Sequence, residues 1–150
     1  MAQGDVTRFD AFLDKLGEKI INLETDTIML ALVTNSVTPA ASTADPCWGA
    51  GGSTNLSTYE VTPGGNYSAG GSAIANNTYV ESGGTATFDG DDVTIAQDGS
   101  NPANARWGII YSDTATNKDC IGYLDLGGVT DLSSGGFTAA WNASGILTIT

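Results

Sequence analysis

The segment "RWGIIYSDTATNKDCIGYLDLG" (residues 106–127) decides the class of fold. Its two ends, 106–114 and 120–127, are rich in β-branched and aromatic residues, which favour strands. Between them, "ATNKD" (115–119) is a polar stretch that is typical of a turn. The segment therefore predicts two strands that flank a short turn.

Further strands are expected on both sides of this segment. "NTYVES" and "TATF" surround Gly83–Gly84 and predict a hairpin, and "DVTIAQ" predicts the next strand. "GFTAAWNASGILTIT" ends the chain and predicts two short strands around 142–145. Strands at this spacing, separated by Gly, Asn, Ser and Asp, favour an antiparallel β-sandwich or a jelly-roll-like domain. The β-strand-rich core is expected over 77–150.

The N-terminal segment, 1–24, predicts the one α-helix. Thr7 is a suitable N-cap with Asp10 three residues later, and Lys15 and Lys19 suit the C-terminal half. An apolar stripe at helical spacing follows: Phe9, Phe12, Leu13, Leu16, Ile20 and Leu23. We expect this helix to pack on a sheet. In the next segment, "TIMLALVT" (27–34), the side chains that would point to either face of a strand are apolar. This predicts a strand that is covered on both sides.

Residues 35–76 predict a long loop or arm that is rich in Gly, Ser, Thr and Asn, with short extended pieces near 56–61 and 66–69. Three aromatic residues lie within it: Trp48, Tyr59 and Tyr67. Because disordered linkers have few aromatic residues, we expect an ordered arm that packs on its own sheet or on a neighbouring subunit. These three residues are the candidates for an interaction surface, since Trp and Tyr often anchor interfaces.

The charge balance excludes one class of partner. The chain has 17 acidic and 5 basic residues, a net charge of −12, and no basic residue between Lys19 and Arg106. Such a chain repels phosphate backbones, so nucleic-acid binding is not expected. Neither a signal peptide nor an apolar run long enough for a membrane span is evident. We therefore expect one domain over 1–150, made in the cytoplasm, without a membrane partner.

The residue types restrict catalysis and metal binding. Without histidine, the chain lacks the commonest general base and the commonest metal ligand. The two cysteines, Cys47 and Cys120, are too few for the usual four-ligand zinc site. They are expected to be unrelated buried thiols, or to form a disulfide if the fold brings them together. No catalytic residue, metal ligand or cofactor is predicted.

The segment "FDGDDV" (88–93) contains three aspartates, Asp89, Asp91 and Asp92. Two functions are considered for them: a calcium site and a pair of catalytic carboxylates. The segment does not match an EF-hand calcium loop, because Asp-Gly-Asp-Asp is not the required order of ligands. Residue 100, at the twelfth position, is serine where the loop needs glutamate. Asp91 and Asp92 are adjacent and would point to opposite sides of a strand, and no spacing selects Glu60, Glu81 or Asp125 as a second glycosidase carboxylate. The prediction is a strand-to-strand turn, and an irregular calcium site stays open.

The order of several segments carries a resemblance over nearly the whole chain. The segments are "FDAFLDKLGEKIINLETDTIMLALVT", "VTPGGNYSAGG", "DDVTIA", "ARWGIIYSDT", "IGYLDLG" and "WNASGILTIT". In this order they resemble a family of small virion structural proteins of tailed bacteriophages. The resemblance implies a non-enzymatic head decoration (cement) protein on the capsid surface.

The resemblance also implies the partners. They would be the major capsid protein and further copies of this chain, with a trimer expected from shell geometry. The alternatives are a tail, head–tail or fibre component, or a carbohydrate-binding module for host attachment.

Overall fold

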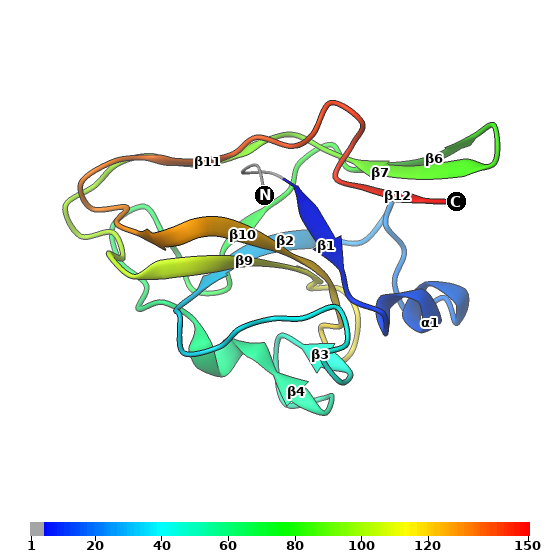
Figure 1. The fold of residues 1–150 in the computed structure, drawn as a ribbon, viewed down its shortest axis with the longest axis horizontal. Helices are drawn as coiled ribbons and strands as arrows, with labels where there is room; N and C mark the ends of the chain where they lie inside the picture. Colours follow the sequence, from blue (N-terminus) through cyan, green and yellow to red (C-terminus); the bar gives the residue numbers. More distant parts are fainter. Residues whose placement is uncertain (1–4) are drawn as a thin grey trace.

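A computed structural model describes residues 5–150, and these residues form a mainly β fold with one short α-helix (Figure 1). The largest sheet has five antiparallel strands in the order β1-β10-β9-β2-β5. Their bounds are β1 (Val6–Arg8), β10 (Cys120–Thr130), β9 (Ala105–Ser112), β2 (Ile28–Val33) and β5 (Ser72–Ala73). The predicted strands on either side of 115–119 are confirmed as β9 and β10, which pair with each other.

A second set of strands lies across one face of this sheet (Figure 1). It comprises a three-stranded sheet, β12 (Leu147–Ile149), β7 (Thr85–Asp89) and β6 (Thr78–Ser82), and a two-stranded ribbon of β11 (Phe137–Ala139) and β8 (Val93–Ile95). The two layers give a sandwich-like fold, as the strand spacing predicts. The last two strands do not pair with each other, because β11 pairs with β8 and β12 pairs with β7.

The main core fills the space between the two layers. Leu30 and Leu32 of β2 meet Phe88 of β7 there, together with residues of β8 and β11. Ala31 and Val33 point to the opposite face of β2 and are also fully buried. The prediction that this strand is covered on both faces is therefore confirmed, because successive side chains of a strand point to opposite sides.

The predicted hairpin at Gly83–Gly84 is also confirmed. β6 and β7 pair in register, and the two glycines between them have φ of +62° and +87°. A two-residue hairpin turn of type I′ has positive φ at both central positions, which glycine adopts without strain. In Figure 1 this hairpin extends beyond the body of the molecule.

The predicted N-terminal helix is too long at both ends. The helix α1 covers only Phe12–Gly17, and Thr7, the predicted cap, lies in β1. Residue 9 continues the strand pairing, since its N–H donates to the Ile121 carbonyl at 3.0 Å. Lys19, with φ of +62°, then ends the helix. Residues 1–4 of the predicted segment lie outside the described residues.

Tertiary pairing explains the difference. Phe9 packs on Tyr123 of β10, with ring centroids 5.2 Å apart, whereas Phe12 enters the main core. Leu13 and Ile20 of the predicted stripe stay exposed. A six-residue helix is too short to be stable by itself, and the sheet edge offers the preceding residues backbone partners that a helix would not.

The arm 35–76 is ordered and packs on its own sheet. It contains β3 (Pro46–Cys47), β4 (Thr54–Asn55) and the 3₁₀ helix η1 (Leu56–Tyr59), before β5 joins the edge of the large sheet. Trp48 and Leu56 bury against the sheet face opposite the main core. The extended piece expected at 56–61 is mainly η1, because the Asn55 side chain accepts the Ser57 N–H and caps a helical turn. The strand expected at 66–69 forms instead at 72–73.

Among the described residues, no helix has both the length and the apolar character needed to cross a bilayer.

Candidate functional site

A cleft of about 650 Å³ lies between β1 and β12. Asp5–Arg8 form one wall, residues 144–148 form the other, and Asp10, Ala41 and Asn142 complete the lining. β1 is the last strand of the five-stranded sheet and β12 is the last strand of the three-stranded sheet. Two strand edges that carry no partner strand among residues 5–150 therefore border the same cleft.

The backbone of β1 offers hydrogen-bonding groups to this cleft. Antiparallel pairs alternate between residues that bond the partner strand and residues whose N–H and C=O point away. Because the residue 9 N–H bonds β10, Thr7 also faces β10, and Val6 and Arg8 face outward. The Asp10 N–H confirms this alternation, because it donates to the Ala41 carbonyl on the outer side at 2.9 Å.

Arg8 is the one cationic side chain that lines the cleft. Its Nε is buried and has no hydrogen-bond partner among residues 5–150, and the guanidinium forms no ion pair with them. The neighbouring Asp5 carboxylate instead accepts the Asn142 side-chain N–H at 3.2 Å. A buried guanidinium N–H without an acceptor is costly, so this side chain is suited to bind a carboxylate or a carbonyl oxygen from a partner.

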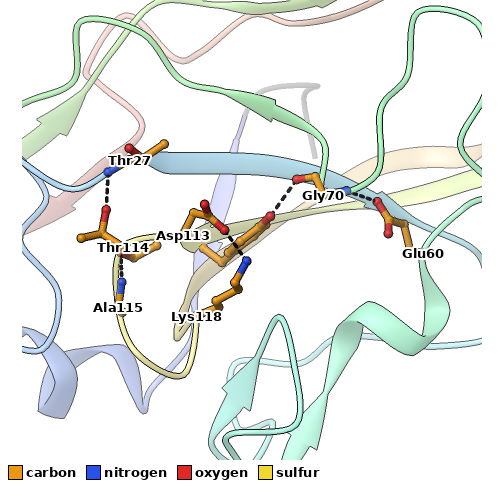
Figure 2. A network of polar contacts seen from close by, with 9 residues as sticks. Thr27, Glu60, Gly70, Asp113, Thr114, Ala115 and Lys118 are labelled. Atoms are coloured by element: carbon orange, nitrogen blue, oxygen red, sulfur yellow. Dashed lines mark hydrogen bonds and ion pairs between the residues drawn. The ribbon is translucent and has the colours of Figure 1, made fainter.

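A second cleft, of about 480 Å³, is lined by residues of the arm, of β9 and of the β9–β10 connection, with Met29 of β2. Figure 2 shows polar contacts of several of these residues. Glu60 accepts the Gly70 N–H at 2.6 Å and the Tyr67 hydroxyl at 2.9 Å. The Gly70 carbonyl accepts the Tyr111 hydroxyl at 2.8 Å, and Lys118 pairs with Asp113 at 2.6 Å. The Tyr111 bond connects the arm to the end of β9, the Glu60 bonds lie within the arm, and the Lys118 pair lies within the β9–β10 connection, so together they hold loops in place.

The two tyrosines of this network remain neutral. Burial is the main cause that raises the pKa of Tyr67 and of Tyr111 well above the ordinary value, and the Glu60 carboxylate adds to both shifts. Both hydroxyls therefore keep their protons at physiological pH and act as hydrogen-bond donors.

The three aromatic candidates of the arm pack against this chain's own core. Trp48 stacks on Tyr111, with centroids 5.1 Å apart and planes at 12°, and is 6% exposed. Tyr67 is 2% exposed, and its hydroxyl accepts the Leu32 N–H at 2.9 Å. Tyr59 is half-buried against the same cluster. Trp48 and Tyr67 are thus largely buried within this chain, Trp48 also lines the second cleft, and the interaction role of the three residues stays a prediction.

Sequence reasoning missed Arg8 and the β1 edge, because the pattern of segment 1–24 predicts a helix there. The adjacent Val6 and Thr7 were the available signal, since β-branched residues favour strands over helices.

The three aspartates of 88–93 lie at a strand junction, as the turn prediction expects. Asp89 ends β7, and Asp91 and Asp92 are exposed ahead of β8. The Asp91 carbonyl accepts the Trp141 indole N–H at 2.8 Å, and the Asp92 carboxylate accepts the Trp141 backbone N–H at 2.9 Å. Within residues 5–150, the three carboxylates do not converge as metal ligands.

The two cysteines are buried free thiols. Burial is the main cause that raises the pKa of Cys47 to about 12, and the Asp119 and Asp45 carboxylates add to it. Burial likewise raises the pKa of Cys120. Both side chains are therefore protonated and weakly nucleophilic at neutral pH.

This predicts that a disulfide reagent such as DTNB at pH 8 labels neither thiol in the folded protein, and labels both in denaturant. Because the folded-state pKa of Cys47 is raised, its contribution to stability is complete below the unfolded value of 9.0 and is lost as the pH rises toward about 12. Rapid labelling of the native protein would contradict the buried placement. A Cys47→Ser variant is the control that assigns the two thiols.

The described part of the chain is a mainly β domain in which two strand edges without a partner strand border one cleft. Comparison with known proteins adds no relative, because no protein-family model, curated protein or solved structure matches this chain.

Proposed function

We propose that this chain is a non-catalytic virion structural protein of the decoration (cement) type, which binds the assembled shell of a bacteriophage at the β1–β12 cleft. The occupant is an extended segment of the major capsid protein. The virion assignment rests on the sequence resemblance, and the mode of binding rests on the cleft. On this proposal the protein is made in the host cytoplasm, acts on the capsid surface and self-associates there, with a trimer as the expected oligomer.

The observation that carries the proposal is the pair of free strand edges that face one cleft. Unpaired N–H and C=O groups on a strand edge accept an added strand, and main-chain hydrogen bonds then supply affinity without catalysis. Arg8 lies on the same edge and would pair with a carboxylate of the added segment.

The net charge of the chain and the thermodynamics of binding to an assembled shell are consistent with this role. A net charge of −12 keeps many copies from associating non-specifically in solution. A protein that binds only the assembled shell stabilises the shell by mass action, by an amount that grows with the free protein concentration. No chemistry at the cleft is needed for this effect.

The proposal is tested with shells that lack the protein. The purified protein should co-sediment with such shells and raise their melting temperature in a saturable manner. The absence of both effects at saturating protein would refute the decoration function.

Within that assay, Val6→Pro should weaken shell binding by at least about tenfold. Proline removes the outward N–H of β1, leaves the N–H groups that bond β10 intact, and is tolerated on strand edges. Val6→Ala is the matched control, because it shortens the same side chain and keeps the N–H. Equal binding by the two variants, with melting temperatures showing both folded, would place the contact away from β1.

A further inference from the structure

Four polar side chains from three separate parts of the chain converge beside the start of β10. Lys15 comes from α1, Asp45 immediately precedes β3 and Cys47 is its last residue, and Asp119 immediately precedes β10. The Lys15 ammonium is 3.1 Å from Asp45 Oδ1 and 3.3 Å from Asp119 Oδ1. One ligand atom each from Asp45, Cys47 and Asp119 lies within 4.8 Å of the other two. This cluster shares no residue with either cleft.

The backbone holds the cluster in place. Cys47 and Asp119 form an antiparallel bridge, and the Trp48 N–H donates to the Lys118 carbonyl at 2.8 Å. The thiol sulfur is 3.8 Å from Asp119 Oδ1. A tetrahedral Zn²⁺ ion with bonds of ~2.0–2.3 Å holds its ligand atoms about 3.3–3.8 Å apart, so this pair already has the required spacing.

One further observation points to a ligand at this cluster, and a second shows how closely the backbone packs around it. Asp119 is 1% exposed, and its Oδ2 has no hydrogen-bond partner among the described residues, although a buried carboxylate oxygen normally has one. A Cβ on Gly52 would overlap both Cys47 Sγ and the Asp45 carbonyl oxygen. Gly52 therefore packs directly against the thiol and the Asp45 backbone, and a side chain at this position would displace them.

The chemistry of the donors selects the ligand. A thiol sulfur with two carboxylates suits a borderline-soft divalent cation and does not suit Ca²⁺ or Mg²⁺, which prefer oxygen alone. A cation already occupies the position, because the Lys15 ammonium contacts both carboxylates. The Asp45 side chain is 39% exposed, so an ion has a path from solvent.

We propose that Asp45, Cys47 and Asp119 form a binding site for a divalent cation of the Zn²⁺ class, which Lys15 closes when no metal is bound. A water molecule would complete the four ligands, as in zinc sites with three protein ligands.

Binding exchanges one set of charges for another without oxidation or reduction. The Cys47 S–H bond breaks, its proton passes to solvent, one metal–sulfur bond and two metal–oxygen bonds form, and the Lys15 ammonium moves into solvent. The two carboxylates plus Lys15 carry a charge of −1 before binding, and the two carboxylates, thiolate and cation carry −1 afterwards. One proton is therefore released per ion. The titratable and charged groups that surround the thiol are Asp119, Asp45, Lys15 and Cys120.

Co²⁺ is the probe, because a thiolate ligand gives it a charge-transfer absorption band. Titration of the full-length protein should give this band with one Co²⁺ per chain, displacement by Zn²⁺, and release of one proton per ion. Cys47→Ser should abolish the band. Cys120→Ser is the matched control, because it removes the other buried thiol and should retain the band.

Lys15→Met tests the closing role. If Lys15 occupies the site nine-tenths of the time or more, its removal should tighten Co²⁺ binding by about tenfold or more. Lys15→Gln replaces it if the methionine variant does not fold. The proposal is overturned if folded wild type and folded Lys15 variant both lack the band, if the band survives Cys47→Ser, or if removal of Lys15 leaves the affinity unchanged.

Discussion

Replacing Gly71 with alanine should destabilise the protein by about 3 kcal/mol or more, the largest effect expected of any single methyl group added to this chain. Gly71 has φ of +83°, and a Cβ there would overlap the Leu30 carbonyl oxygen and lie 2.6 Å from Ala31 Cα. Positive φ costs a residue with a Cβ about 1–2 kcal/mol. Overlap with the backbone of β2 adds about 1–3 kcal/mol, because a central strand cannot move aside. Urea unfolding, followed by tryptophan fluorescence, measures the difference.

Gly83→Ala is the matched control. Gly83 also has positive φ, of +62°, but no atom lies within 4 Å of the Cβ position. It should cost only the strain, about 1 kcal/mol. Equal losses for the two variants would show that the packing of β5 on β2 is not as tight as described.

Lys15→Met should destabilise the metal-free protein by about 3 kcal/mol, the second large effect. Asp119 is 1% exposed and Lys15 is its cationic partner, so the substitution leaves a buried carboxylate without a counter-charge. Breaking a buried pair from one side costs about 3–5 kcal/mol, and the partly exposed lysine places this pair at the lower end. For a chain of this size the loss lowers the melting temperature by roughly 6–12 °C.

Lys118→Met is the control for that measurement. Lys118 pairs with Asp113 at 2.6 Å, but their side chains are 46% and 41% exposed. An exposed pair contributes about 1 kcal/mol at most, so this variant should melt close to wild type. Adding Asp119→Asn to Lys15→Met should restore most of the stability, since no charge then remains buried. Failure of the double variant to recover would assign the loss to packing of the lysine stem.

Local sequence patterns were sufficient for most of the β structure. The strands around 115–119, the Gly83–Gly84 hairpin and the doubly covered strand at 28–33 all follow from side-chain alternation and turn residues within short windows. These signals are local because a strand's faces and a tight turn depend on neighbouring residues. The turn that carries Asp91 and Asp92 was predictable for the same reason.

The N-terminal segment shows where local pattern fails. Its apolar spacing fits a helix, yet β10 recruits Val6–Arg8 as an edge strand and leaves only six residues helical. Local pattern also left open whether the arm with Trp48 and Tyr67 packs on its own sheet or on a neighbouring subunit, and the structure buries both side chains within this chain. Packing against a distant sheet decides such cases, because the burial and backbone bonds gained there outweigh intrinsic propensity.

Both sites of this protein depend on contacts between residues far apart in the chain. The strand-edge cleft brings Arg8 opposite residues 144–148, and the proposed metal site brings Lys15 to Cys47 and Asp119. Composition and local pattern specified a mainly β, strongly acidic domain. Only the tertiary structure decided which edges stay unpaired and which carboxylates share a cation, because strand order and loop closure, rather than local spacing, set those distances.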